Sequence, residues 1–180
     1  MSDVQGVPMI RRVVTEAMAS VADETVVVLG FEAEKVKAEL FGLGCRFVLN
    51  EDFEAGQSSS VRRGVGSVSD HAEAALILPG DVAFVSSAVI DRVIEVYRES
   101  GAPIVVASRG RRSGHPILFH KSLFSDIMEI DEIGKGLKKV TTKYSSKIKR
   151  VDVGSDAILL DVDTKADLTK YASRKDRIKT

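Results

Sequence analysis

Short apolar runs alternate with helical patterns along the first 107 residues, and this alternation restricts the fold more than any other feature of the chain. The runs at 25–29, 74–78 and 103–107 are rich in Val, Ile and Leu and have the length of strands buried on both faces. Apolar residues between them recur at helical spacing, most clearly over 86–100, which ends before Gly101. This order predicts an α/β fold of three layers, with a mostly parallel sheet covered by helices on both faces.

The second half of the chain adds elements of a different order. Residues 115–119 follow a basic turn at 109–114, and they predict an antiparallel strand that makes the sheet mixed. The other predicted elements are helices that begin at Pro8, Ser58 and Thr164, helices at 32–41, 121–129 and 134–144, and strands at 46–49, 147–153 and 157–160. Without a repeat or a linker-like segment, residues 1–180 are expected to form one domain.

Composition excludes several classes of protein. The 180 residues are 44% hydrophobic and 29% charged, which is typical of a globular chain. Basic and acidic residues both number 26, and this zero net charge argues against a general nucleic-acid-binding protein. The single cysteine, Cys45, excludes an internal disulfide. No apolar stretch approaches the roughly 20 residues of a membrane span, so we expect a cytoplasmic protein without a membrane partner.

The zero net charge hides an asymmetry between the halves of the chain. The first 90 residues have a net charge of −6 and the last 90 a net charge of +6. Much of the positive excess is concentrated in Lys135, Lys138, Lys139, Lys143, Lys147, Lys149 and Arg150. Such a run could attract an anionic ligand, but on its own it is more typical of a solvated helix face followed by a strand.

Ligands of open α/β sheets bind beyond the carboxyl ends of the strands, and three segments stand out there. The first is 50–64 (NEDFEAGQSSSVRRG), which combines Gly56, three hydroxyl groups and a helix start. A helix N-terminus suits a phosphate or a ribose because its N–H groups are unpaired and its dipole end is positive. An ordinary helix capped by Ser58 is the alternative interpretation.

The second segment is 78–81 (LPGD), which places Asp81 just after a buried strand. A carboxylate at this point can bind Mg²⁺ through oxygen, although a turn-capping Asp is the more common case. Asp161 and Asp163 precede the last predicted helix, where one could cap the helix and the other could reach the same edge of the sheet.

The third segment is 109–116 (RGRRSGHP), in which three Arg and two Gly precede a strand. Arginine pairs with phosphate in two-pronged fashion, so the segment suits an anion-binding loop, with an exposed basic hairpin as the alternative. His115 and His120 are a poor metal pair, because residues five apart on a strand point to opposite faces.

Taken in order, these segments resemble a known family. The run NEDFEAGQSSSVRRG is followed by LILPGDVAFVS, GHPILF and LLDVDTKADL, and the helix GVPMIRRVV precedes them all. In this order and spacing they resemble the MobA/MocA-like nucleotidyltransferases, which make the dinucleotide forms of the molybdenum cofactor. The resemblance extends from Gly6 to Leu168 and implies a Rossmann-like nucleotidyltransferase fold.

The resemblance also implies a role for each segment. The expected reaction is attack by the terminal phosphate of molybdopterin on the α-phosphorus of CTP or GTP, with release of pyrophosphate. Asp81 and Asp163, with Asp161 as the weaker choice, match the acidic positions that hold Mg²⁺ and are the expected catalytic residues. The expected nucleotide-binding residues are Asn50, Gly56, Ser58 and Ser59, and the expected substrate-binding residues are Arg112, Gly114, His115 and Pro116.

The sequence departs from the family at one important point. The signature LAAGxSxRMG, which forms the first strand and the loop around the triphosphate, is absent. The sheet is therefore expected to lack that strand, which is usually central in this fold. Three hypotheses stay open. The retained acidic residues favour an enzyme, and the missing loop favours a non-catalytic relative that binds a nucleotide, a pterin or a partner. The third, an unrelated α/β domain whose acidic residues only cap helices, is disfavoured by the order of the motifs. A second copy of the chain or a molybdoenzyme is the macromolecular partner that the resemblance suggests.

Overall fold

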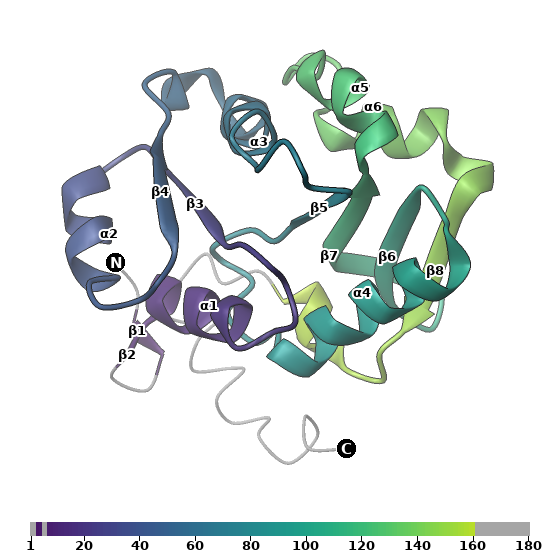
Figure 1. The fold of residues 1–180 in the computed structure, drawn as a ribbon, viewed down its shortest axis with the longest axis horizontal. Helices are drawn as coiled ribbons and strands as arrows, with labels where there is room; N and C mark the ends of the chain where they lie inside the picture. The colour runs from purple at the N-terminus through teal and green to yellow at the C-terminus, as the bar shows by residue number, and fades with distance from the viewer. Residues whose placement is uncertain (1–2, 5–6, 161–180) are drawn as a thin grey trace.

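The computed structural model describes residues 3–4 and 7–160, which alternate between strands and helices as Figure 1 shows. β1 (Asp3–Val4) and β2 (Val7–Pro8) form a short antiparallel ribbon. α1 (Met9–Met18) follows directly after Pro8, in agreement with the predicted helix start. Its apolar side is covered by the rest of the molecule, with Val13 and Val14 fully buried.

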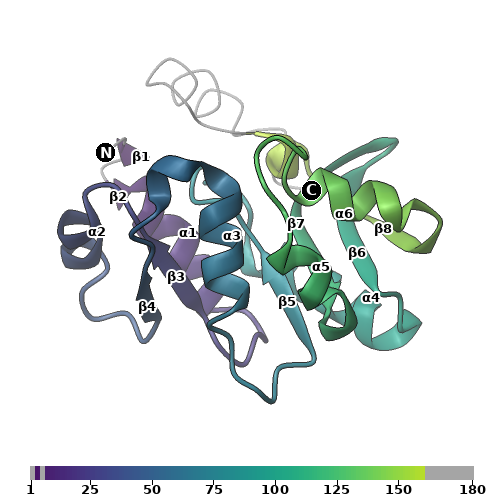
Figure 2. The ribbon, with the colours of Figure 1, turned by 90° about the horizontal axis from the view of Figure 1, so that it is seen from above.

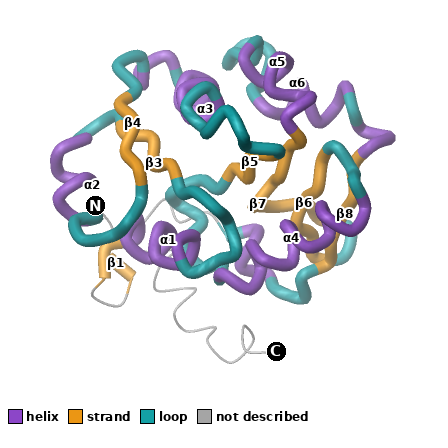
Figure 3. The backbone as a smooth tube through the Cα atoms, viewed as in Figure 1, coloured by secondary structure: helices purple, strands orange, loops and turns teal. Residues whose placement is uncertain are grey.

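The strands form two larger groups, which Figure 3 shows in orange. β3 (Val26–Leu29) pairs in parallel with β4 (Arg46–Leu49), and α2 (Ala33–Glu39) connects the two. The second group has four strands in the order β5-β7-β6-β8, which are β5 (Ala74–Ile77), β7 (Arg112–His120), β6 (Ile104–Arg109) and β8 (Ile148–Asp152).

β7 makes the sheet mixed, because it runs antiparallel to both of its neighbours. It is the strand predicted at 115–119, and it is inserted between β5 and β6, whereas β6 and β8 pair in parallel. α4 (Ser87–Ser100) makes the crossover from β5 to β6 and ends at Gly101, whose φ of 61° lies in the left-handed region.

The helices form two layers, one on each side of the strands. Figures 1 and 2 show α1 and α4 on one face, and α3 (Gln57–Val65), α5 (Phe124–Met128) and α6 (Leu137–Lys143) on the other. Short 3₁₀ turns complete the description at Phe53–Ala55, Lys121–Leu123, Ser145–Lys147 and Asp156–Leu159. The predicted three-layer Rossmann-like architecture is therefore confirmed.

The core lies in two apolar layers against the four-stranded sheet. Successive residues of β6 point to opposite faces, so Val105 packs against α4 while Ile104 packs among the helices of the other face. Phe119 of β7 is completely buried in that second layer. The packing of the sheet thus holds in place the carboxyl end of β5 and the first half of β7, which border the candidate site.

The sheet is interrupted between β3 and β5. In the described part of the chain these two strands do not pair with each other, and no other strand pairs with both of them. That a central strand is missing stays a prediction, because residues 161–180 lie outside the described part of the chain.

One predicted strand is wrong. Residues 157–160 were expected to be extended, but Asp156–Leu159 forms a 3₁₀ turn. The Ser155 hydroxyl accepts a hydrogen bond from the Ala157 N–H group at 3.2 Å, which favours a turn over a strand at this point. Elsewhere, no helix in 7–160 has both the length and the apolar composition needed to cross a membrane.

Candidate functional site

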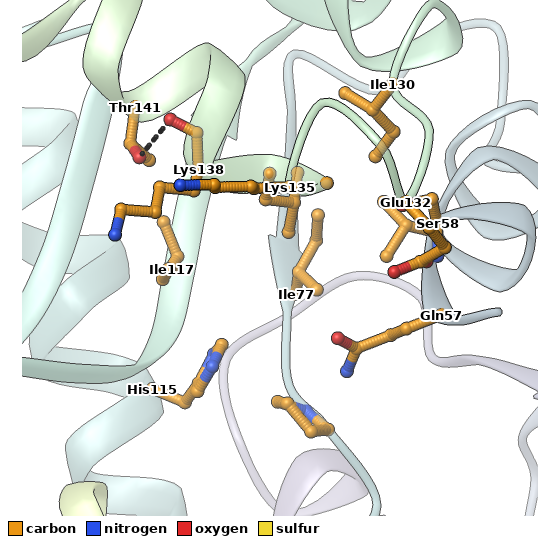
Figure 4. A pocket seen from close by; sticks show the side chains of 14 residues that line it. Gln57, Ser58, Ile77, His115, Ile117, Ile130, Glu132, Lys135, Lys138 and Thr141 are labelled. Carbon is orange, nitrogen blue, oxygen red and sulfur yellow. Dashed lines mark hydrogen bonds between the residues drawn. The ribbon is translucent and has the colours of Figure 1, made fainter.

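A pocket of about 360 Å³ opens between α3, the ends of β5 and β7, and the segment that leads into α6 (Figure 4). Its volume is in the range of small-molecule sites. Both apolar and polar groups contribute to the walls, which are formed by Gln57, Ser58, Val61, Ile77, Pro79, His115, Ile117, Ile130, Glu132, Lys135, Gly136, Leu137, Lys138 and Thr141. The pocket therefore brings together two predicted segments, 50–64 and 109–116, through Ser58 and His115.

The segment 129–136 holds the N-terminal turn of α3 in place. The Ser58 N–H group donates a hydrogen bond to Glu132 Oε1 at 2.6 Å, and the Arg62 guanidinium donates to the Ile130 carbonyl oxygen. The Ser58 N–H group holds the pKa of Glu132 below its ordinary value, because this bond stabilises the charged carboxylate. A carboxylate 74 residues away thus caps the positive end of the α3 dipole.

Gly56 is required by the backbone at the start of α3. Its φ is +97°, a region that side chains rarely adopt, and a Cβ atom at this position would lie 2.5 Å from Glu132 Cγ. The prediction that Ser58 is the N-cap is wrong, because α3 begins at Gln57 and Gly56 holds the cap position without a side-chain hydrogen bond. The cap comes instead from Glu132, whose contact with α3 is not encoded locally.

Asn50, which directly follows β4, lies close to Ser59 in the first turn of α3. The Asn50 amide group donates hydrogen bonds to the hydroxyls of Ser59 at 2.8 Å and Ser60 at 3.0 Å. The Ser59 hydroxyl in turn donates to the Gly56 carbonyl oxygen at 2.7 Å. Asn50 and Ser59 are buried and do not line the pocket, so in this structure they fix the loop that leads into α3.

The predicted substrate-binding residues are spread along β7. Arg112 is exposed at the tip of the β6–β7 hairpin, opposite Arg109, and does not line the pocket. Gly114 lies against the 3₁₀ turn at 156–159, where a Cβ atom would be 2.0 Å from the carbonyl oxygen of Ile158. Only His115 lines the pocket, and it is joined by a cis peptide bond to the buried Pro116.

Asp81 is half-buried four residues after the end of β5, at the carboxyl edge where it was predicted. It follows Pro79, which lines the pocket. Its predicted partners Asp161 and Asp163 lie outside the described residues. Over 7–160, no group of three or more His, Cys, Asp or Glu side chains is arranged to hold a metal ion.

Several pocket residues were not predicted as site residues. Gln57 lies in the predicted segment 50–64 but was not named as a site residue, whereas Glu132 and Thr141 carry no recognisable motif and reach the pocket only through the folding of 129–143 beside it. Lys135 and Lys138 belong to the basic run, which was interpreted as a solvated face. The density of lysines in this run is the sequence signal that could have identified Lys135 and Lys138 as site residues.

Comparison with solved structures places this fold among known proteins. A crystal structure of a homologue, from Mycobacterium sp. strain JC1, of the Mycobacterium tuberculosis protein Rv0371c is 25% identical, with a TM-score of 0.82 over 99% of this chain and 88% of that one. Rv0371c of M. tuberculosis in complex with manganese is 24% identical, with a TM-score of 0.75 over 94% and 88%. A nucleotidyl transferase from Methanothermobacter is 22% identical, with a TM-score of 0.79 over 96% and 82%.

Sequence comparison gives the family directly. No curated protein matches this chain. The family model of the MobA-like NTP transferase domain matches residues 1–148, which include α1, the loop into α3, Asp81 and the His115 segment. The chain therefore belongs to the MobA-like NTP transferase family.

Proposed function

We propose that this protein is a nucleotidyltransferase that transfers CMP or GMP from CTP or GTP to molybdopterin and releases pyrophosphate. The observation that carries the proposal is the pocket itself, which joins the N-terminal turn of α3 to His115 beside the carboxyl end of β5. Family membership supports the nucleotide, and the resemblance to the molybdenum-cofactor enzymes supports the acceptor. CTP is the first choice, because NEDFEAGQSSS is most similar to the cytidylyltransferase branch.

The proposed reaction needs no nucleophile from the protein. A phosphate oxygen of the acceptor attacks the α-phosphorus of the nucleotide, the bond between that phosphorus and the bridging oxygen of the β-phosphate breaks, and pyrophosphate leaves. The task of the protein is to hold both substrates in line, which can itself supply a large part of the rate enhancement. In this proposal Gly56 shapes the loop that binds the nucleotide, and His115 contacts the acceptor.

Asp81 fits a divalent metal ion, because a half-buried carboxylate at this edge offers the oxygen ligands that Mg²⁺ prefers. Mg²⁺ is usually bound by one or two carboxylates together with phosphate oxygens of the substrate, so we propose Asp81 and Asp163 as its protein ligands. Bound there, the ion would neutralise charge on the phosphates. The manganese complex of the M. tuberculosis neighbour supports a divalent cation in proteins of this fold.

The test is a calorimetric titration of the chain with CTP and with GTP, each with Mg²⁺. We expect one of them to bind, and Asp81→Asn to weaken the binding by about tenfold or more, the loss of one charged contact. Asp70→Asn is the matched control, because Asp70 is exposed and does not line the pocket. A folded chain that binds neither nucleotide would contradict the proposal and favour the non-catalytic hypothesis.

A further inference from the structure

The α6 side of the pocket carries two cations to which the proposed function gives no role. Lys135 and Lys138 line this wall, and Figure 4 shows them above Ile117 with His115 across the pocket. We propose that this wall binds a phosphate group of the acceptor substrate, with the two ammonium groups as its cations and the Ser58 hydroxyl as a hydrogen-bond donor. The assignment to the acceptor rests on the proposed function, whereas the phosphate site rests on the geometry alone.

Ser58 provides the first observation. The residue is only 3% exposed, and its hydroxyl forms no hydrogen bond of ordinary geometry among the described residues, although it lies close enough to the Glu132 carboxylate to help lower the pKa of that group. Buried hydroxyls are nearly always hydrogen-bonded, because an unsatisfied one costs the free energy of its lost hydration. Since Ser58 also lines the pocket, a ligand oxygen is the partner that fits.

The two lysines provide the second observation. Within residues 7–160, neither ammonium group forms an ion pair or a hydrogen bond, whereas Lys121 and Lys143 each contact a carboxylate at 2.7 Å. Cations without a protein partner at the wall of a cavity are suited to an anionic ligand.

The backbone before α6 provides the third. Lys135 and Gly136 have φ values of +64° and +57°, and Lys135 is a non-glycine residue in a region that costs conformational energy. This turn brings the start of α6 close to Ser58, since a Cβ atom on Gly136 would lie 3.1 Å from the Ser58 hydroxyl oxygen. The strained turn therefore places the lysines on the same pocket as that hydroxyl.

Glu132 is the acidic group that lines this pocket, and it does not cancel the attraction. Its carboxylate accepts the Ser58 N–H hydrogen bond, so its charge is already stabilised by the end of α3. Two lysines against one glutamate leave a net positive charge on the wall. Ile77, Ile117 and Leu137 add apolar surface for the body of the acceptor.

The probe for this site is inorganic phosphate, titrated into the full chain and followed by calorimetry and by NMR of the backbone amides. Lys135→Gln/Lys138→Gln is expected to weaken phosphate binding by about tenfold or more. The control variant Lys37→Gln/Lys149→Gln removes the same charge from exposed positions that do not line the pocket. We expect it to bind phosphate within about twofold of the wild type, because salt screens the attraction of distant exposed charges.

Ser58→Ala separates binding from folding. Because the hydroxyl forms no hydrogen bond of ordinary geometry with the described protein, we expect the melting temperature to change little while phosphate binding weakens. The proposal would be overturned if the wild-type chain did not bind phosphate, or if both lysine double variants lost phosphate affinity equally.

Titration of the same variants with CTP and GTP identifies the source of the phosphate. We expect Lys135→Gln/Lys138→Gln to leave nucleotide affinity within about twofold of the wild type, because in this proposal the lysines contact the acceptor and not the nucleotide. A parallel loss of nucleotide affinity would assign the lysines to the triphosphate and overturn the acceptor assignment. Phosphate binding that depends on the lysines in a chain that binds no nucleotide would support the phosphate site and refute the proposed function.

Discussion

Gly56→Ala tests whether the start of α3 is constrained as the structure indicates. Alanine at this position meets two obstacles, a φ of +97° and a contact of 2.5 Å between its Cβ atom and Glu132 Cγ. Such backbone strain costs about 1–3 kcal/mol, and forcing an extra methyl group into occupied space costs about 1–3 kcal/mol. We therefore expect the free energy of unfolding to fall by about 2–6 kcal/mol.

Urea denaturation followed by circular dichroism measures this loss, and at about 2–4 °C for each kcal/mol the melting temperature gives a second measure. Repeating Gly56→Ala in a Glu132→Ala background separates the two causes. Glu132→Ala removes the atoms that the new methyl group would strike, which are Cγ, Cδ and Oε1, so the steric part of the cost should disappear and the backbone part should remain. Equal costs in both backgrounds would refute the steric argument, and a loss below about 0.5 kcal/mol would refute both arguments.

Three further predictions follow from the described residues. Gly114→Ala places a Cβ atom 2.0 Å from the Ile158 carbonyl oxygen and should destabilise the protein by about 1–3 kcal/mol or more in urea denaturation, whereas Gly44→Ala, whose nearest contact is at 3.4 Å, should be nearly neutral. Phe119→Ala empties a fully buried site and should cost about 3–5 kcal/mol by the same assay. The hydrogen bond from Lys143 lowers the pKa of Asp126 below its ordinary value of 3.8. The ionised Asp126 carboxylate therefore stabilises the folded state above pH 3.8, and this stabilisation is lost as the pH falls through the lower pKa of the folded state. Asp126→Asn should therefore flatten the acid side of the stability profile, and an unchanged profile would contradict this assignment.

Most of the fold is predictable from the sequence because its elements are locally encoded. The strand at 46–49 and the helix that ends at Gly101 have the periodicity, β-branching and stop signals that fix such elements. The antiparallel strand was predicted at 115–119 and extends over 112–120, because part of the predicted basic turn at 109–114 continues the pairing with β6. The 3₁₀ turn at 156–159 was mistaken for a strand, because a short apolar run does not by itself distinguish the two.

The candidate site was less predictable, because its contacts join distant segments. The Ser58–Glu132 hydrogen bond spans 74 residues, and nothing around either residue encodes it. Asn50 and Ser59 were predicted as nucleotide ligands from the resemblance, but in the structure they bond to each other and do not line the pocket. The roles of Asp81 and His115 stay predictions, and Asp163 lies outside the described residues.

The most direct test of the central claim is transfer of the nucleotide itself. The chain would be incubated with CTP or GTP labelled at the α-phosphate, with Mg²⁺ and with molybdopterin, and both the labelled product and pyrophosphate would be counted. We predict that label appears on the pterin, that one pyrophosphate is released for each transfer, and that Asp81→Asn abolishes both signals. A chain that binds the nucleotide but neither labels the pterin nor releases pyrophosphate would contradict the claim that this protein is a nucleotidyltransferase acting on molybdopterin.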